Sequence, residues 1–337
     1  MTPAPGGLAA GLGYALAAGL LWGMVFVAPA VLHDYPPVVL SIGRYLAFGL
    51  IAAVLAIGAA PALKALRRAD WIEASKLSLV GNLLYYSCLA SAIQLAGPPL
   101  PTLVIGTLPL VIAVCSNRSE QALPWRRLWL PLLVIAAGLA LVNADEFAAF
   151  TAAASAQAGF QAADGAGSGD AAGGTRSYVA GALLALGAVA CWTWYPIRNA
   201  RWLRQRPGLR SDVWATAQGL TTLPLAAAGG LVLWAATAAG MPIGAQDFDG
   251  PLGPRPALFI AAMLLMGLLS SWAGTLCWNR ASQLLPTSLV GQLIVFETLS
   301  ALALAFAWRA QWPPPATAAG IAALVLGVVL GVRAFQS

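Results

Sequence analysis

Apolar stretches of about twenty residues recur along nearly the whole chain, and no other feature restricts its possible folds as strongly. A helix of that length crosses the hydrocarbon core of a bilayer, where every backbone polar group must be hydrogen-bonded within the protein. Hydrophobic residues make up 60% of the sequence and charged residues 9%. These observations predict an all-α polytopic membrane protein and argue against a soluble domain.

The apolar stretches are separated by polar or Gly/Pro-rich turns and are numbered here as spans in chain order. We expect ten transmembrane helices, at about residues 8–32, 38–60, 73–96, 100–116, 128–143, 178–197, 213–239, 257–285, 287–308 and 315–332. The segment between spans 5 and 6 is rich in alanine, glycine and serine, which is typical of a flexible linker. The chain is therefore predicted to hold a first five-helix repeat (1–143), a periplasmic linker (144–177) and a second five-helix repeat (178–337).

The basic residues predict the orientation of these helices. With a cytoplasmic N-terminus, the loops after spans 2, 4 and 6 face the cytoplasm and contain Lys64, Arg67, Arg68, Arg118, Arg126, Arg127, Arg198, Arg201, Arg204, Arg206 and Arg210. The opposite side has Arg176, Arg255 and Arg309. Because cytoplasmic loops are enriched in Lys and Arg, we expect a multi-pass protein of the bacterial inner membrane with both termini cytoplasmic. This asymmetry also accounts for the net charge of +6, so we expect no nucleic-acid partner.

An internal repeat relates the two halves. Cys88 and Cys277 are separated by the same number of residues as three further pairs, which are Gln94 with Gln283, Pro124 with Pro313, and Gly138 with Gly327. Spans 3–5 therefore resemble spans 8–10. Because five is an odd number, the second five-helix repeat must enter the membrane in the opposite sense. Inverted repeats of this kind place a central cavity near the midplane and permit alternating access.

Glu297 is the first candidate for a functional residue. It lies about 16 Å along span 9 from Pro286, which is close to the midplane of a hydrocarbon core roughly 30 Å thick. Acids at this depth are rare, and by default they indicate a functional site. Since desolvation favours the neutral form of a carboxyl group, Glu297 is a candidate to exchange a proton or to bind a cation. The alternative is a structural acid that is paired with an arginine or hydrogen-bonded between helices.

Large aromatic side chains inside spans 1, 3 and 6 form a second group of candidates: Trp22, Tyr85, Tyr86, Trp192, Trp194 and Tyr195. Rings with a polar edge that face a cavity suit an aromatic or apolar solute. The alternative is that these rings pack against lipid or neighbouring helices.

Four polar or charged residues and one proline complete the candidates. Asn82 and Gln292 are candidates to hydrogen-bond the solute, although such side chains also join transmembrane helices to one another. Arg280 could bind a carboxylate of the solute or extend to the cytoplasmic interface. Arg44, within reach of the outer interface, is interpreted as an interfacial or packing residue. Pro109 lies inside span 4 and is predicted to act as a kink or hinge.

Several stretches resemble the EamA-type branch of the drug/metabolite transporter superfamily. They are Trp22-Gly23, the stretch PPVVLSIGRYLAFGL with Arg44, Thr107-Leu108-Pro109-Leu110, and the block CWNRASQLLPTSLVGQLIVFE in spans 8 and 9. The resemblance covers nearly the whole chain. It implies a ten-helix exporter or permease of the bacterial inner membrane for amino acids, metabolites or drugs. Span 9 in that family often carries a proline opposite the one in span 4, whereas Glu297-Thr298 stands at this place here.

The favoured hypothesis is a secondary transporter, with export as the expected direction. It would move a small organic solute by alternating access, and Glu297 would be the group that couples transport to protons. We expect a monomer or homodimer in the lipid bilayer, with no cofactor or metal and no enzymatic activity.

Two alternatives remain beside it, a membrane-embedded enzyme and a non-transporting scaffold or channel. The only histidine, His33, is in a loop, which makes a histidine-based catalytic triad improbable. No phosphate-binding glycine loop is present in a soluble segment. A channel would more naturally show a repeated filter or a ring of charges, and neither is visible.

Overall fold

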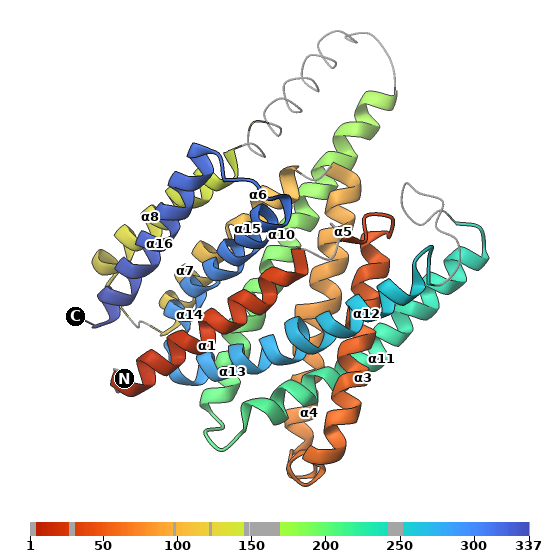
Figure 1. Ribbon diagram of the computed structural model, residues 1–337, viewed down its shortest axis with the longest axis horizontal. Helices are drawn as coiled ribbons and strands as arrows, with labels where there is room; N and C mark the ends of the chain where they lie inside the picture. Colours follow the sequence, from red (N-terminus) through yellow and green to blue (C-terminus); the bar gives the residue numbers. More distant parts are fainter. Residues whose placement is uncertain are drawn as a thin grey trace.

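The computed structural model shows helices gathered into one bundle (Figure 1). It describes residues 5–26, 31–96, 99–120, 123–144, 148, 169–241 and 252–336. Within these residues all regular elements are helical, and nine helices are long and apolar enough to cross a membrane. A shorter apolar helix at the start of the chain brings the number to the ten expected. The prediction of an all-α polytopic membrane protein is confirmed.

The helices follow the predicted order. Span 1 consists of α1 (Pro5–Gly23) with the 3₁₀ turn η1 (Met24–Phe26), and span 2 of α3 (Pro37–Lys64). Span 3 consists of α4 (Arg68–Ser78), η2 (Leu79–Leu84) and α5 (Tyr85–Ala96). Span 4 consists of α6 (Pro99–Gly106) and α7 (Leu108–Glu120), and span 5 of α8 (Trp125–Val142). Span 6 consists of α10 (Gly169–Arg204), and span 7 of α11 (Ser211–Ala238). Span 8 consists of α12 (Pro256–Met266), η3 (Gly267–Ala273) and α13 (Gly274–Leu284). Span 9 consists of α14 (Thr287–Leu293) and α15 (Val295–Arg309), and span 10 of α16 (Pro315–Gln336).

Some helix ends differ from the sequence-based expectation. The first turn of α4 starts five residues before the predicted span 3, because the Asp70 carboxylate accepts a hydrogen bond from the Arg67 backbone N–H at 2.8 Å and caps the helix. The first residues of α10 belong to the segment predicted as linker, so residues 169–177 are helical here. Residues 145–147 and 149–168 of the predicted linker lie outside the described part of the chain.

Helices of one half pack mainly against helices of the other. The principal pairs are α8 with α16, α3 with α11, α7 with α14, α5 with α10, α6 with α10, α1 with α13, and α1 with α15. Figure 1 shows the first two pairs at opposite sides of the bundle. In terms of spans these pairs are 5 with 10, 2 with 7, 4 with 9, 3 with 6, 4 with 6, 1 with 8, and 1 with 9. The same set of pairs results when spans 1 to 5 are exchanged with spans 6 to 10 in order. Two related repeats would produce such a pattern; the inverted sense of the second repeat remains a prediction.

Spans 3 and 8 share an irregularity of the backbone. Each contains a π-helical segment, η2 in span 3 and η3 in span 8, where a wider helical turn replaces the α-helical one. Asn82 in η2 and Ser271 in η3 are 189 residues apart, as are Cys88 and Cys277. The sequence repeat therefore corresponds to a repeated feature of the backbone.

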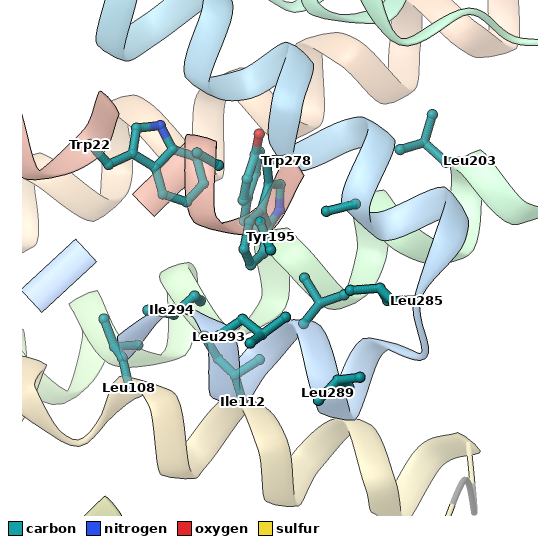
Figure 2. Packing of buried hydrophobic residues seen from close by; sticks show 14 of the residues in the cluster. Trp22, Leu108, Ile112, Tyr195, Leu203, Trp278, Leu285, Leu289, Leu293 and Ile294 are labelled. Atoms are coloured by element: carbon teal, nitrogen blue, oxygen red, sulfur yellow. The ribbon is translucent and has the colours of Figure 1, made fainter. Parts of the chain in front are cut away.

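Spans 4 and 9 are both interrupted near their middle. In span 4 the break falls at Thr107, two residues before Pro109, which has no backbone N–H to continue the helical bonding. In span 9 the break falls at Ile294, where the sequence predicted a continuous helix. Gly291 allows the two spans to cross closely, because a Cβ atom there would lie 2.7 Å from Cγ2 of Ile112. Figure 2 shows the buried side chains around this crossing.

Span 1 packs against span 9 through two glycines, Gly19 and Gly23. A Cβ atom on Gly19 would lie 2.7 Å from Cβ and 2.9 Å from the carbonyl carbon of Phe296, and one on Gly23 would lie 2.5 Å from Cβ of Ser300. Small residues four positions apart let two helix backbones approach each other in this way. The first turns of α15 are therefore held directly against α1.

We predict that Gly19→Ala destabilises the protein, whereas Gly13→Ala on the same helix does not. The methyl group added at Gly19 meets the backbone of α15, and overpacking of this kind costs about 1–3 kcal/mol. No atom lies within 4 Å of a Cβ atom at Gly13. The melting temperatures of the two purified variants in detergent test this prediction. Equal melting temperatures would show that α1 and α15 are not in close contact at Gly19.

Candidate functional site

Glu297 lies in the first turn of α15, immediately after the break in span 9. Its backbone N–H donates to the Ile294 carbonyl at 2.9 Å, so backbone hydrogen bonding resumes directly after the break. The side chain is partly accessible, although Glu297 is far from both ends of span 9. Among the residues that the structure describes, none donates a hydrogen bond to the Glu297 carboxylate or forms an ion pair with it. The charge of the Glu297 carboxylate is therefore not neutralised by an ion pair with any described residue.

Arg44 in α3 is a charged residue of the first half that interacts electrostatically with Glu297. Its Nε atom donates to Oγ of Ser271 at 2.9 Å, so the guanidinium points to the π-helical segment η3 and into the bundle. The Arg44 and Glu297 side chains are close enough to interact electrostatically but form no ion pair. Arg44 was interpreted as an interfacial or packing residue, and the bond to Ser271 agrees with the packing role.

Tyr85 connects this pair of charges to a group of aromatic rings. It interacts electrostatically with both Glu297 and Arg44, and its ring centroid lies 4.9 Å from that of Trp192. Trp192 in turn stacks on Tyr195 at 5.2 Å and meets Trp22 edge-on at 6.1 Å. Four of the six predicted aromatic residues are thus brought together. They come from spans 1, 3 and 6.

A fifth ring, Trp278 of α13, completes what we call the aromatic cluster: Trp22, Tyr85, Trp192, Tyr195 and Trp278. The Trp278 centroid lies 5.0 Å from that of Trp22, and Figure 2 shows both rings near Tyr195. Trp278 was not among the predicted site residues, although it stands in the block of spans 8 and 9 that carries the family resemblance.

Two rings of the aromatic cluster lie against glycines in or next to the π-helical segments. A Cβ atom on Gly81 in η2 would lie 2.4 Å from Cδ2 of Tyr195, and one on Gly274, directly after η3, would lie 2.7 Å from Nε1 of Trp22. Each ring therefore occupies the space that a side chain on the irregular helix would need. Spans 3 and 8 are therefore in direct contact with the aromatic cluster at these glycines.

Buried amide side chains form a hydrogen-bond network beside the cluster. The Tyr195 hydroxyl donates to Oε1 of Gln218 at 2.9 Å. Asn199 accepts from Nε1 of Trp214 at 2.8 Å and donates to Oδ1 of Asn279 at 2.8 Å. Nδ2 of Asn279 has no hydrogen-bond partner among the described residues. This network joins spans 6, 7 and 8 and fixes the hydroxyl edge of Tyr195.

Two other predicted residues lie near the site but have different surroundings. Tyr86 is half-buried and interacts electrostatically with Arg44 and Tyr45, so it borders the same region. Asn82 donates from Nδ2 to Oγ1 of Thr222 at 3.1 Å, which joins span 3 to span 7. That contact corresponds to the structural alternative for Asn82.

Three predicted residues lie away from the aromatic cluster. Trp194 is 37% exposed and has no ring partner among the described aromatic residues. Arg280 is exposed and donates to Oε1 of Gln283 at 3.2 Å. Gln292 is fully buried between helices, and its Oε1 atom would lie 2.0 Å from a Cβ atom on Gly331 of α16. The structure thus does not bring these three side chains to the site.

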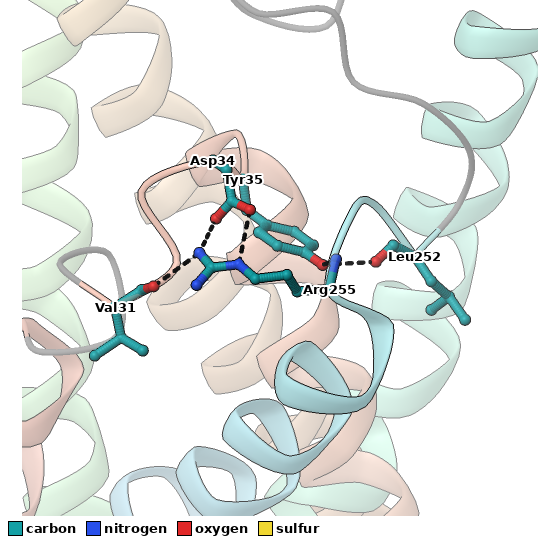
Figure 3. A network of polar contacts seen from close by, with 5 residues as sticks. All are labelled: Val31, Asp34, Tyr35, Leu252 and Arg255. Atoms are coloured by element: carbon teal, nitrogen blue, oxygen red, sulfur yellow. Dashed lines mark hydrogen bonds and ion pairs between the residues drawn. The ribbon is translucent and has the colours of Figure 1, made fainter.

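At one end of the bundle, which we call the Asp34 end, a polar network joins the two halves (Figure 3). Arg255 forms an ion pair with Asp34, with 2.9 Å between Nε and Oδ2, and donates to the Val31 carbonyl at 2.9 Å. The hydrogen-bonded Arg255 guanidinium holds the pKa of Asp34 below its ordinary value. Tyr35 accepts from the Arg255 backbone N–H and donates to the Leu252 carbonyl, both at 2.9 Å. The five residues of this contact lie in two segments, 31–35 and 252–255, that are far apart in the sequence.

The opposite end of α3 has a second set of ion pairs between the halves, which we call the Asp70 end. Arg206 pairs with Asp70, with 3.0 Å between Nη1 and Oδ1. Arg198 pairs with Glu73 in a bidentate geometry, with 3.0 Å between Nη2 and Oε2. Both carboxylates are buried, and the ring of Trp202 lies under both guanidiniums.

The described part of the chain contains no group of three or more His, Cys, Asp or Glu residues that could hold a metal ion. The chemistry available at the site is therefore that of two opposite charges, aromatic rings and amides. These groups suit the binding of a solute. They do not form a nucleophile, base and orienting acid of the kind that covalent catalysis uses.

Comparison with known proteins identifies the family. Residues 9–144 match the model of the EamA-like transporter family. The chain is 46% identical over 330 residues to the inner membrane protein YtfF of Escherichia coli (strain K12), covering 96% of this chain and 95% of that protein. A solved crystal structure that is 19% identical covers 98% of this chain and 99% of its own, with a TM-score of 0.69, and supports the fold. The chain therefore belongs to the EamA-like transporter family of the drug/metabolite transporter superfamily.

Proposed function

We propose that this membrane transporter is a secondary transporter that moves a small organic solute by alternating access, with export as its direction. The observation that carries the proposal is the position of Arg44 and Glu297. They come from different halves, interact without an ion pair, and lie beside the aromatic cluster. Spans 4 and 9 are broken near their middle, and spans 3 and 8 contain π-helical segments. Discontinuous helices surround the midplane sites of secondary transporters. Irregular backbone at membrane depth is tolerated only when protein or an aqueous cavity surrounds it.

The membrane is proposed to be the bacterial inner membrane, as for the relative that is named an inner membrane protein. Figure 1 shows both ends of the chain at the same side of the bundle. The basic loops after spans 2, 4 and 6 favour a cytoplasmic location for that side. In this orientation the Asp34 end faces the periplasm and the Asp70 end faces the cytoplasm.

Alternating access requires contacts between the halves that open at one end while the other stays closed. The ion pairs at the Asp34 end and the Asp70 end both join the first half to the second. We propose that these two sets of pairs break in turn. The interruptions of spans 4 and 9, with Pro109 beside the first, are the proposed hinges.

Glu297 is proposed to bind either a proton or a cationic group of the solute. Arg44 and Tyr85 are the charged and titratable groups with which it interacts, and the positive charge of Arg44 opposes the binding of a proton or cation. The proposal is supported instead by the carboxylate itself, which forms no ion pair with any described residue. A carboxylate that has no protein partner at this depth gains from any group that neutralises it. Binding of either species would thus be linked to the movement of α15.

We predict that Glu297→Gln lowers transport at least about tenfold, as expected from the loss of a charge-assisted hydrogen bond to the transported species. The measurement compares the solutes released by cells that overexpress the wild-type protein or the variant. For each solute whose release differs, the rate of transport is then measured in proteoliposomes over a range of pH.

Glu297→Asp serves as the control, because it keeps the carboxylate and should retain part of the transport. Insertion of each variant is checked by its amount in the membrane. If Glu297→Gln transports at the wild-type rate at every pH, Glu297 neither couples transport to protons nor binds the solute.

We also predict that Asp34→Arg opens the Asp34 end, and that Asp34→Arg with Arg255→Asp closes it again. The side chains of Arg255 and Asp34 are 38% and 27% exposed, so water and salt weaken the pair, and we expect the labelling rate to rise at most about fivefold. The measurement is the rate at which a membrane-impermeant thiol reagent, added from outside, labels Tyr85→Cys in a variant without native cysteines. Equal labelling rates in the single, double and parent variants would contradict the role of this ion pair.

A further inference from the structure

A groove of about 380 Å³ lies where α3 and α4 meet α11, away from the aromatic cluster. Ala56 and Ala60, four residues apart on one face of α3, line part of it, because their methyl groups leave room that larger side chains would fill. Trp71 of α4 and Leu220 of α11 line the rest together with further apolar residues. The volume is that of a small-molecule site. Because α11 belongs to the second half of the chain, the groove is bounded by both halves.

The surface next to the groove has no protein cover. Val54 and Ile57 of α3 and Ile72 of α4 are large apolar residues, and all three are exposed. Spans 2 and 3 are long and apolar enough to cross a membrane, so lipid tails surround such side chains there. The molecule that reaches the apolar part of the groove most readily is therefore a lipid with its acyl chain.

One end of the groove is charged. Lys64, the last residue of α3, lines it beside the apolar residues. Lys64 lies about 6 Å along the helix beyond Ala60, where the apolar span was expected to end, and about 12 Å beyond Ala56. The ammonium group is thus placed at the level of the lipid headgroups, and Ala56 at the level of the acyl chains. Trp71 is half-buried, as is typical of rings at the membrane interface.

The charge of Lys64 is not neutralised by the protein. No ion pair joins it to a residue in the part of the chain that the structure describes. The two acids of α4 are already paired with arginines, Asp70 with Arg206 and Glu73 with Arg198. Neither acid therefore competes for Lys64 with an anion from outside the protein.

We propose that this groove binds an anionic phospholipid, with one acyl chain along Ala56 and Ala60 and the phosphate at Lys64. Basic pockets between membrane-spanning helices bind anionic headgroups in this way. The exposed Arg67 and Arg68, which follow in the same loop, add to the positive potential. The site requires only that spans 2, 3 and 7 cross the membrane, so it is independent of the transported solute. A lipid bound there contacts both halves beside the Asp70 end.

The test compares two phospholipids with the same palmitoyl and oleoyl chains. Phosphatidylglycerol has a net negative charge, whereas phosphatidylethanolamine has none and carries an ammonium group that Lys64 repels. The purified full-length protein is titrated with each lipid in detergent, and bound lipids are counted by native mass spectrometry. Phosphatidylglycerol is expected to bind about fivefold more tightly, as one lysine near a headgroup provides. Inorganic phosphate, added as a competitor without an acyl chain, should not displace it.

Variants then assign the two parts of the lipid to the groove. Lys64→Gln should remove most of the preference for phosphatidylglycerol, and Lys64→Arg should keep it. Ala60→Leu fills the groove and should weaken the binding of both lipids at least about fivefold, the lower limit expected from overpacking. The exposed Arg201→Gln on α10 and the exposed Ala322→Leu on α16 are the matched controls and should change neither result.

Equal affinities for the two lipids would overturn the proposal, as would a preference that survives Lys64→Gln. It would also be overturned if Ala60→Leu acts no more strongly than Ala322→Leu, or if inorganic phosphate displaces the lipid, which would assign the site to a free anion. Lipid-free melting curves show whether each variant is folded, and Ala56→Leu replaces Ala60→Leu if the latter is not. Binding is measured without transport, so neither result decides the other.

Discussion

The need to hydrogen-bond every backbone group inside the membrane determines where this protein can place its site. A regular α-helix meets that need by itself and a π-helical turn meets it with wider i→i+5 bonds, whereas a break leaves backbone groups that neighbouring helices must cover. Spans 3, 4, 8 and 9 are irregular, and neighbouring spans cover them with close contacts such as Gly291 against Ile112 and Gly81 against Tyr195. Because irregular helices must be shielded, they gather where the two halves meet. The candidate charges and rings occur on or beside these helices for the same reason.

Each span corresponds to the span five places later, and this correspondence also holds for the ion pairs at the two ends of the bundle, except that the acid and the base change places. At one end an acid that follows span 1, Asp34, meets a base that precedes span 8, Arg255. At the other end a base that follows span 6, Arg206, meets an acid at the start of span 3, Asp70. Spans 1 and 8 correspond to spans 6 and 3 under the exchange. The two halves are therefore joined by an ion pair at corresponding places at both ends, with the acidic and basic residues exchanged.

Much of the fold could be predicted because hydropathy, loop composition and the offset between Cys88 and Cys277 act over whole helices. The break in span 9 could not, since Ile294 carries no proline signal and the interruption depends on how span 9 crosses span 4. For the site, four aromatic residues were predicted and came together, because rings deep inside spans tend to face other helices. For Arg44 the sequence left an interfacial and a packing role open, because its distance from the helix end allows either, and only the contact with Ser271 shows the packing role. Gln292 has a polar side chain but lies in a helix contact that sequence spacing does not reveal.

The two ends of the bundle differ in how much water surrounds their ion pairs. The Asp34 side chain is 27% exposed, whereas the Asp70 and Glu73 side chains are 4% and 2% exposed. Dissolved salt screens exposed charges over about 8 Å at physiological ionic strength, but it reaches buried carboxylates much less. The relative strength of the two closures is therefore a function of the medium. If the two ends open in turn as proposed, saltier surroundings would weaken the Asp34–Arg255 pair more than the pairs of Asp70 and Glu73, and osmotic conditions would bias the side on which the empty site is exposed.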